Sequence, residues 1–232
     1  MQIKNSVVLV TGANRGLGQA FVNALLQAGA AKIYAAARDP SSITLQGVVP
    51  IQLDVTKAAD IAAAAARCTD LTLLINNAGI LRGSTFLAPG SADAARAELE
   101  TNFFGPLALS QAFAPILKAN GGGAIVNVLS VLSWLNISAG ATYSASKSAA
   151  WSLTNGLRGE LRPQGTQVVG VHVGFMDTDM ARGVPGPKAD PLDVARQTLT
   201  ALEEGQDEVL ADDLSRNVKQ GLSAGVYLGQ VN

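Results

Sequence analysis

Short runs of apolar residues alternate along the chain with longer segments in which apolar residues recur at helical spacing. The short runs are continuously apolar, which is typical of strands that are buried on both faces of a parallel sheet. They predict strands at 6–10, 32–36, 48–53, 71–75, 124–129, 167–173 and 208–211. The segments between them predict helices at 17–27, 57–67, 92–118, 144–161, 191–204 and 213–222. This alternation favours a single-domain, Rossmann-like α/β fold over 1–232, a doubly wound parallel sheet of about seven strands with helices on both faces.

The segment 175–191 interrupts the alternation. It contains Gly183, Pro185, Gly186 and Pro187, a mixture that favours a loop over regular structure. In open α/β sheets, ligands bind outside the carboxyl ends of the strands, and this segment follows the sixth predicted strand. We therefore expect 175–191 to be a substrate loop over the ligand crevice.

Composition and charge restrict the possible partners. Hydrophobic residues make up 48% and charged residues 15% of the 232 residues, as expected of a globular protein. The net charge of −1 and the absence of a basic stripe argue against nucleic acid as a partner. No secretory signal is visible, and no run reaches the ~18 apolar residues of a membrane span. We expect a soluble, cytoplasmic protein with no membrane partner.

The rarer residues point to no metal and no disulfide. Cys68 is the single cysteine and is interpreted as a small buried residue. His172 is the single histidine and lies in an apolar run, so we expect a core or crevice-edge histidine rather than a catalytic one. No cluster of histidine, cysteine and acidic residues has the spacing of metal ligands.

A glycine-rich turn follows the first predicted strand. Residues 11–18 read Thr-Gly-Ala-Asn-Arg-Gly-Leu-Gly and lead into a predicted helix, the context of a dinucleotide site. Gly12 allows a tight turn, Gly16 lets the backbone approach a pyrophosphate, and Gly18 permits close packing of helix on strand. The helix N-terminus offers free N–H groups and a partial positive charge to phosphate. The predicted cofactor contacts in this turn are Gly12, Asn14, Arg15, Gly16, Leu17 and Gly18.

The second predicted strand indicates which dinucleotide is bound. An acidic residue at its end would bind the free ribose 2′-hydroxyl of NAD, but no carboxylate occurs before Asp39. Arg38 lies there instead, and Arg15 is a second candidate; guanidinium groups suit phosphate oxygens. Taken singly, each arginine is more simply a solvated surface residue. Their joint placement predicts NADPH/NADP as the cofactor.

Tyr143 and Lys147 lie four residues apart near the start of a predicted helix, so they share a face. A nearby ammonium group stabilises a phenolate, so Lys147 is expected to lower the pKa of Tyr143 from its free value of about 10. Ser130 closes the fifth predicted strand, and its hydroxyl can bond the substrate oxygen while Tyr143 protonates it. Tyrosine and lysine at this spacing are commonplace on helices. Three other serines compete with Ser130, namely Ser133, Ser144 and Ser146.

Together these motifs resemble the short-chain dehydrogenase/reductase family over nearly the whole chain. The turn at 11–18 resembles its TGxxxGxG motif, and 76–79, Asn-Asn-Ala-Gly, resembles its NNAG element. Ser130, Tyr143 and Lys147 resemble its catalytic serine and YxxxK pair, and Asn102 resembles its catalytic asparagine. Val173-Gly174 departs from the family's usual Pro-Gly.

The resemblance implies roles for further residues. Lys147 would also bind the nicotinamide ribose, and Asn102 would hold a water that links Lys147 to solvent. Asp54 and Val55 would contact the adenine; the alternative for Asp54 is an aspartate in the turn that ends the third predicted strand. The remaining implied cofactor contacts are Asn77, Ala78, Gly79, Tyr143, Gly174 and Thr178. The family also implies a homodimer or homotetramer built through the helices at 92–118 and 144–161.

Mostly apolar residues are expected to line the substrate pocket, which favours a neutral, hydrophobic small-molecule ketone or aldehyde. They are Leu81, Leu132, Trp134, Leu135, Phe175, Met176 and Met180. The sequence thus predicts an oxidoreductase, an NADPH-dependent carbonyl reductase. The alternatives are an alcohol dehydrogenase that works oxidatively and a non-catalytic NADP-sensing regulator. A cofactor-free lyase of the halohydrin dehalogenase type would lack the glycine turn and the lysine.

Overall fold

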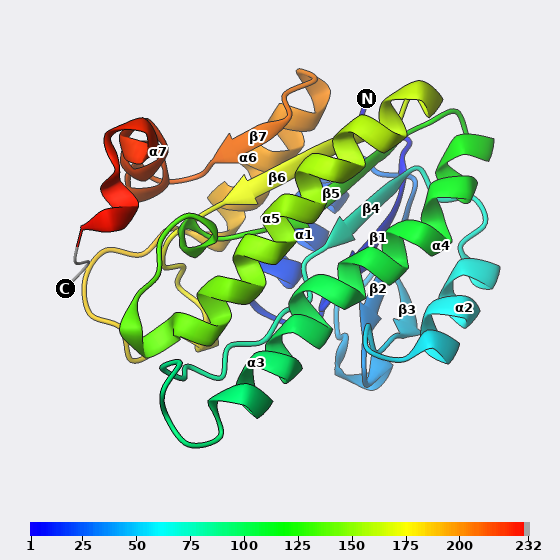
Figure 1. Cartoon of the computed structure of the whole chain (residues 1–232). Helices are drawn as coiled ribbons and strands as arrows, with labels where there is room; N and C mark the ends of the chain where they lie inside the picture. The colour runs from blue at the N-terminus through cyan, green and yellow to red at the C-terminus, as the bar shows by residue number, and fades with distance from the viewer. Residues whose placement is uncertain (230–232) are drawn as a thin grey trace.

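The computed structural model describes residues 1–229 (Figure 1). Seven parallel strands form one sheet in the order β3-β2-β1-β4-β5-β6-β7. The strands are β1 (Val7–Thr11), β2 (Lys32–Ala37), β3 (Val49–Gln52), β4 (Leu73–Asn76), β5 (Ala124–Val128), β6 (Gln167–His172) and β7 (Glu208–Leu210). The predicted doubly wound α/β fold is confirmed.

Helices connect the strands and cover the sheet. They are α1 (Gly16–Gln27), α2 (Ala58–Arg67), α3 (Ser91–Leu99), α4 (Gly105–Ala119), α5 (Ala141–Leu161), α6 (Pro191–Glu203) and α7 (Asp213–Gly221). Their bounds and those of the strands lie within three residues of the predicted ones. The exception is the single helix expected at 92–118, which is divided into α3 and α4.

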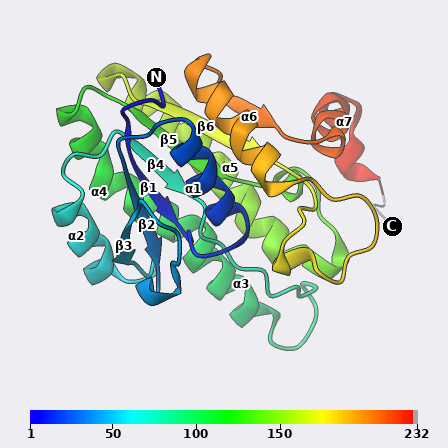
Figure 2. The same cartoon turned by 180° about the vertical axis from the view of Figure 1, so that it is seen from behind.

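The hydrophobic core has two layers, one on each face of the sheet. Along β1, Val8 and Val10 pack toward α1 and α6, whereas Leu9 packs toward α2, α4 and α5. Successive side chains of a strand point to opposite faces, so a continuously apolar strand fills both layers. Figure 1 shows α4 and α5 in front of the sheet, and Figure 2 shows α1 and α6 on the other face.

A π-helical turn, Glu100–Phe104, joins α3 to α4. It contains Asn102, which is 2% exposed. Such turns widen the helical repeat by one residue and often occur at functional sites. The apolar spacing of the sequence did not reveal it, because one widened turn leaves the pattern on either side almost unchanged.

Two features place the ligand crevice. Strand order reverses between β1 and β4, and the loops that follow the strands meet there at the carboxyl edge of the sheet. The segment between β6 and α6 lies over this edge. It contains a short 3₁₀-helix, Asp179–Ala181, and a bridge between Met176 and Ala189, so it is only partly irregular.

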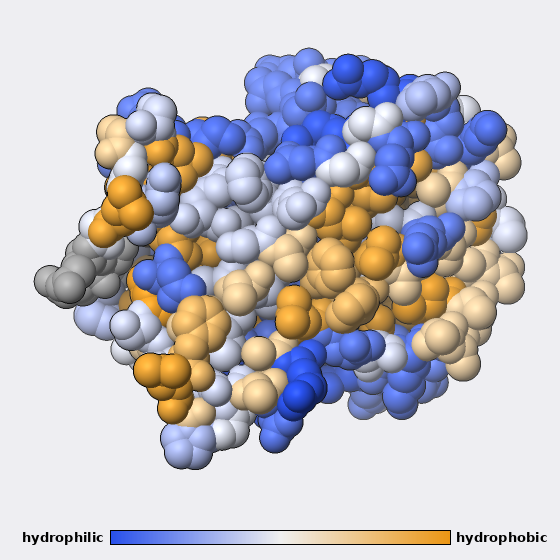
Figure 3. Space-filling model, viewed as in Figure 1, coloured by the Kyte–Doolittle hydropathy of each residue, from blue (hydrophilic) through white to orange (hydrophobic). Residues whose placement is uncertain are grey.

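The outer surface is uneven in character. Apolar side chains gather over α4 and the neighbouring part of α5, while polar residues dominate the surface around them (Figure 3). Within residues 1–229, no helix is both long enough and apolar enough to cross a membrane.

Candidate active site

The glycine turn between β1 and α1 has a backbone shape that favours glycine at two positions. Gly12 has φ +64° and Gly16 has φ +52°, in the left-handed region that disfavours side chains. A Cβ on Gly18 would lie 2.0 Å from the Gly12 carbonyl oxygen, so α1 packs directly on the turn. The structural roles expected of these glycines are thus present.

The helix that follows presents its N-terminus to the crevice. α1 begins at Gly16, and the Arg15 side chain pairs with Asp179 across the crevice instead of capping the helix. The first turn carries no acidic residue that would repel an anion. Free N–H groups beside a cradle that a Cβ would fill suit a dinucleotide pyrophosphate. The residues present therefore fit this part of the cofactor.

The segment after β4 braces the glycine turn. The Asn77 side-chain amide donates to the carbonyl oxygens of Thr11 (2.8 Å) and Gly12 (3.2 Å). The backbone N–H groups of Asn77 and Ala78 both donate to Thr11 Oγ1, each at 3.0 Å. Thr11 is therefore a supporting residue that sequence reasoning did not single out.

Gly79 lies where the cofactor and catalytic elements meet. A Cβ at this position would lie 3.1 Å from Asn102 Oδ1 and 3.8 Å from Lys147 Nζ. A larger residue would press on both side chains. The NNAG segment, the π-helical turn and α5 thus converge at one point of the crevice.

The Asn102 side chain is committed to structural hydrogen bonds. Its Oδ1 accepts from the Ile80 N–H at 2.9 Å, and its Nδ2 donates to the Ile80 carbonyl and to Ser146 Oγ, each at 2.9 Å. A water held by Asn102, as the family resemblance implied, would have to use the second lone pair of Oδ1 or the main chain, because both Nδ2 hydrogens are already donated. Ser146, treated in the sequence only as a competitor of Ser130, supports Asn102.

Ser130, Tyr143 and Lys147 come together below the crevice, and their side chains are almost wholly buried. The Ser130 hydroxyl lies close enough to the Tyr143 phenol to lower its pKa. Lys147 Nζ lies 5.7 Å from the centre of the Tyr143 ring and donates to the Val128 carbonyl at 2.7 Å. Tyr143 and Lys147 lie on one face of α5, as their spacing predicts.

Burial sets the titration of both α5 residues. It raises the pKa of Tyr143 above its ordinary value, the Ser130 hydrogen bond opposes this rise, and the charge of Glu98 adds to it. Burial also lowers the pKa of Lys147 to about 8. The expectation that Lys147 lowers the pKa of Tyr143 is not met by the protein's own groups, because desolvation of the phenolate dominates.

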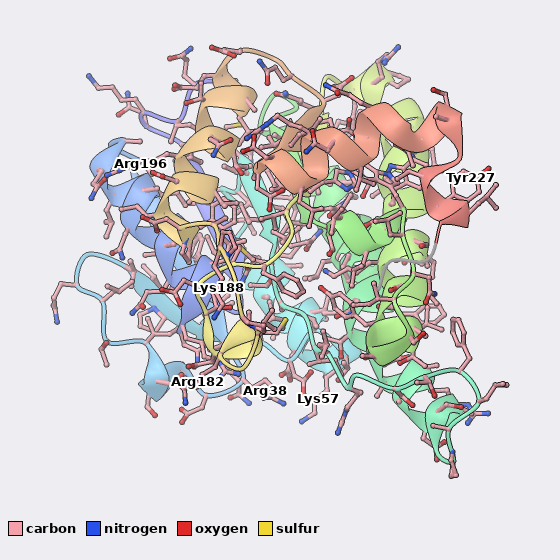
Figure 4. All side chains as sticks on the ribbon, turned by 90° about the vertical axis from the view of Figure 1, so that its left-hand side faces the viewer. Arg38, Lys57, Arg182, Lys188, Arg196 and Tyr227 are labelled. Carbon is pink, nitrogen blue, oxygen red and sulfur yellow. The ribbon has the colours of Figure 1, made fainter. Side chains whose placement is uncertain are left out.

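The predicted adenosine end carries several cations. Arg38 follows β2, and Lys57 precedes α2. Burial acts to raise the pKa of Asp54, but the hydrogen bonds from Thr56 and the nearby charges of Lys57 and Arg38 together lower it. Figure 4 shows Arg38 and Lys57 along the same edge of the molecule. Asp54 Oδ1 accepts from Thr56, which makes it a turn aspartate.

Two other implied cofactor contacts have their own packing partners. Val55 is 7% exposed and lies against Gly105 at the start of α4. Gly174 donates its N–H to Asp212 at 2.7 Å, and a Cβ there would clash with Asp212 and Leu214. At the position where Val173 replaces the family's usual proline, the chain therefore leads into a glycine that lies in close contact with the start of α7.

Thr178 and Asp179 bring the loop after β6 against the glycine turn. A Cβ on Gly16 would lie 3.3 Å from Thr178 Cγ2. Arg15 pairs with Asp179 at 3.5 Å, and Asp179 also pairs with Arg182. Because these ion pairs are exposed, they hold the loop only weakly.

The residues expected to line the substrate pocket fall into two groups. Leu81, Phe175 and Met180 are 44%, 43% and 54% exposed. Trp134 and Leu135 are instead buried in a small cluster below α7, so they support the pocket rather than offer a free surface. The two partly buried members are Leu132 and Met176.

Sequence reasoning overlooked Glu98 on α3. It is fully buried, and its Oε1 accepts from the Arg82 N–H at 2.7 Å. Glu98 lies one helical turn before Asn102, so the two side chains hold the segment 80–82 from one face. The four-residue spacing between Glu98 and Asn102 would have placed both on one helix face, but a glutamate in a helix normally faces solvent and is therefore not expected in a site.

Comparisons with known proteins agree with this geometry. Residues 6–188 match the family described as short chain dehydrogenase. A short chain dehydrogenase of Burkholderia cenocepacia, solved in complex with NADP, is 45% identical, with a TM-score of 0.93 over 97% of this chain and 95% of that one. An NADP-dependent 3-hydroxy acid dehydrogenase of Schizosaccharomyces pombe is 28% identical over 99% of both chains.

Proposed function

The chain belongs to the short-chain dehydrogenase family of oxidoreductases, and on that premise we propose that it reduces a neutral, hydrophobic ketone or aldehyde with NADPH. The observation that carries the proposal is the buried Ser130–Tyr143–Lys147 cluster beside the braced glycine turn. A regulator that only sensed NADP would have no need of buried acid–base groups, which are costly to fold.

Each residue of the cluster has a role in carbonyl reduction. NADPH supplies the hydride that adds to the carbonyl carbon. Tyr143 gives its phenolic proton to the carbonyl oxygen as the π electron pair moves onto that oxygen. Ser130 donates a hydrogen bond to the same oxygen, and Lys147 stabilises the phenolate that remains.

Burial of Tyr143 favours the reductive role. Reduction requires the protonated phenol, and burial raises the pKa of Tyr143, so the proton donor is present at neutral pH. Alcohol oxidation requires the phenolate, which the same burial disfavours. The oxidative alternative is therefore expected to need a higher pH than reduction.

The preference for NADPH rests on the cations around the predicted ribose. Arg38 and Lys57 flank Asp54, and Arg15 lies in the glycine turn. The relative from Burkholderia cenocepacia was solved with NADP. Together these support recognition of a 2′-phosphate.

The apolar substrate class rests on the exposed side chains of Leu81, Phe175 and Met180 around the crevice. Apolar walls with few polar groups suit neutral organic carbonyl compounds. The substrate loop, 175–191, would close the pocket over them.

We also propose a homodimer or homotetramer that uses α4 and α5. Apolar residues gather on this face (Figure 3), and a Cβ on Gly156 would meet nothing within 4 Å. Ala145 and Ala149 are accessible on α5, whereas Ala150 is buried. Light scattering at micromolar concentration should give a mass above that of one chain, and a monomer would contradict the proposal.

The test of the reaction is Tyr143→Phe, which removes one oxygen and keeps the ring. Turnover of NADPH with the best of a panel of aryl and alkyl ketones should fall by at least ~100-fold. NADPH binding, followed by fluorescence, should be retained. The matched control is Tyr227→Phe, because Tyr227 is exposed at the C-terminal end of the described chain (Figure 4).

The two outcomes separate the alternatives. If Tyr143→Phe binds NADPH and keeps more than about a tenth of the parent rate, Tyr143 is not the acid. If the unaltered protein binds NADPH but turns over no carbonyl compound or alcohol, the regulator is the better interpretation.

A further inference from the structure

His172 lies directly beside the catalytic serine, on the neighbouring strand. The backbone bonds on either side fix this alignment: the N–H of Leu129 donates to the Val171 carbonyl at 2.8 Å, and that of Val131 donates to the Val173 carbonyl at 3.0 Å. Ser130 lies between the two donor residues, Leu129 and Val131, and His172 lies between the two acceptor residues, Val171 and Val173. The sheet itself therefore brings the imidazole to Ser130.

The imidazole contacts the main chain of Ser130. His172 Nδ1 lies 3.2 Å from the Ser130 carbonyl oxygen. Because a carbonyl oxygen only accepts hydrogen bonds, Nδ1 must carry the hydrogen. The same oxygen also accepts from the Ser133 N–H at 2.9 Å, so both of its lone pairs are used.

The other ring nitrogen makes no hydrogen bond within the described chain that would fix a proton on it. Within residues 1–229, His172 Nε2 has no hydrogen-bond partner, and Glu208 Oε1 lies 3.5 Å away. The Glu208 carboxylate is already paired with Lys219 at 2.8 Å. Burial lowers the pKa of His172 to about 3, which favours the neutral ring; the hydrogen bond to Ser130 opposes this shift, and the charges of Lys219, Arg158 and Lys147 add to it.

Stacking fixes the orientation of the ring. The Trp134 indole lies on the His172 ring, with centroids 3.8 Å apart and planes inclined by 15°. Trp134 ends the short turn after Ser130, whose hydroxyl accepts from the Leu132 N–H at 3.1 Å. Rotation of the imidazole would therefore disturb the turn that contains the catalytic serine.

We propose that His172, as the neutral Nδ1–H tautomer clamped by Trp134, is a positioning residue that holds the Ser130 main chain and so aims its hydroxyl at the substrate oxygen. It touches neither substrate nor cofactor. The inference rests on the proposed reductase function, because the role of Ser130 belongs to that function.

Two variants separate the hydrogen bond from the packing. His172→Phe keeps a flat ring against Trp134 but loses the donor, and kcat should fall about five- to tenfold, the effect of one hydrogen bond. His172→Asn restores an N–H near the Nδ1 position but loses the ring. It should retain kcat within about twofold of the parent, although its Tm should be lower.

A purely structural role predicts the opposite order, with Asn the more damaged variant because it leaves a cavity. The KM for NADPH should change less than about twofold in both variants, since the glycine turn is untouched. Thr198→Val is the control. It removes a buried hydrogen bond to Val194 on α6, away from Ser130, and should leave kcat unchanged. A His172→Phe variant with the parent kcat, or an Asn variant slower than Phe, overturns the proposal.

The Ser130→Ala background gives a second test. If His172 acts by aiming the Ser130 hydroxyl, then His172→Phe should cause no further loss of kcat once that hydroxyl is gone. A further fall of fivefold or more in the double variant, about that of one hydrogen bond, would mean that His172 acts by another route.

One measurement does not depend on activity. Because His172 is the only histidine, nitrogen NMR of histidine-labelled, tag-free protein reports on this ring alone. The spectrum should show the neutral Nδ1–H tautomer at neutral pH. The Nε2–H tautomer or a charged ring would overturn the proposal, even if no carbonyl substrate were found. Absence of turnover in the parent with the Nδ1–H tautomer present would instead contradict the reductase function alone.

Discussion

The cofactor side and the catalytic side of the crevice are built on different principles. On the cofactor side, the contacts converge on main-chain atoms of the glycine turn: Gly18 lies against the Gly12 carbonyl, and the Asn77 side-chain amide donates to the carbonyl oxygens of Thr11 and Gly12. On the catalytic side, ionisable side chains are buried, with burial acting on the pKa values of Tyr143 and Lys147. The structure of the cofactor side therefore depends on close packing of the backbone, whereas the properties of the catalytic side depend on the free energy of removing charged groups from water.

This difference determines how each side should fail. A shape built from backbone contacts tolerates no added atom, and its failure should not depend on pH. Buried ionisable groups tolerate small changes of shape but make stability depend on pH. Between the two sides, the exposed Arg15–Asp179 pair is expected to contribute little.

The largest effect is expected from Gly18→Ala. The new Cβ would lie 2.0 Å from the Gly12 carbonyl oxygen, so the turn and α1 must move apart. We expect a loss of about 3 kcal/mol in the free energy of unfolding and at least a tenfold weaker affinity for NADPH. Urea unfolding and fluorescence titration measure the two. Gln19→Ala, on the same helix, is the control and should be close to the parent. A Gly18→Ala variant with parental NADPH affinity would show that the turn is not held by shape.

Lys147→Met should reveal the cost of the buried charge. The pKa of Lys147 is lowered by burial from 10.5 to about 8, so the unfolded chain binds more protons between these values. Relative to the Lys147→Met variant, the parent should therefore gain stability as pH rises from about 8 toward 10.5 and lose that gain as pH falls back to 8. The difference should be on the order of 2 kcal/mol by pH 10; both proteins share the opposing effect of the buried Cys68 thiol, whose pKa is raised to about 12.

Urea midpoints at pH values on both sides of this window check the prediction. Lys118→Met replaces an exposed lysine at the end of α4 and should keep the parental pH dependence. Equal slopes in the parent and in Lys147→Met would mean that the buried ammonium is not destabilising.

Arg38→Ser tests the charged end of the cofactor side. Loss of one charge-assisted contact, about 1.5–3 kcal/mol, should raise the KM for NADPH by at least tenfold and leave that for NADH nearly unchanged. Steady-state kinetics with both cofactors give the ratio. Arg196→Ser is the control, because Arg196 bonds Gln27 on the outer surface, away from this edge (Figure 4). An equal rise in the KM values for NADPH and NADH would mean that Arg38 does not bind the 2′-phosphate.

The two sides also differ in what the sequence could predict. The glycine turn, the strands and the Tyr143–Lys147 spacing follow from local rules, because backbone geometry and helical periodicity are written in adjacent residues. The positions of Asn102 and Ser146 required a tertiary contact, since their hydrogen bonds join segments 44 residues apart. The spacing of residues within one helix or strand cannot predict a contact such as Asn102–Ser146.

Burial caused the remaining differences. Trp134 looked like a pocket residue because it follows a strand end, but its indole stacks on His172 in the interior. The pKa of Tyr143 was expected to fall because a lysine lies near it in sequence. Whether a nearby charge outweighs desolvation depends on the depth of the site, and only the fold supplies that depth.

The smallest effect is expected from Asp179→Asn, at the contact between the two sides. Asp179 pairs with Arg15 at 3.5 Å, with side chains 51% and 71% exposed, and it also pairs with Arg182. Exposed pairs are worth little, so the change should alter NADPH affinity by no more than about threefold. The direction should be a gain, because Arg15 is released to meet a phosphate, and added salt should erase it. Fluorescence titration at low and high salt measures both, with Asp193→Asn on α6 as the control. A loss of NADPH affinity of more than about tenfold, well beyond an exposed pair, would instead make Asp179 a latch that holds the loop on the cofactor.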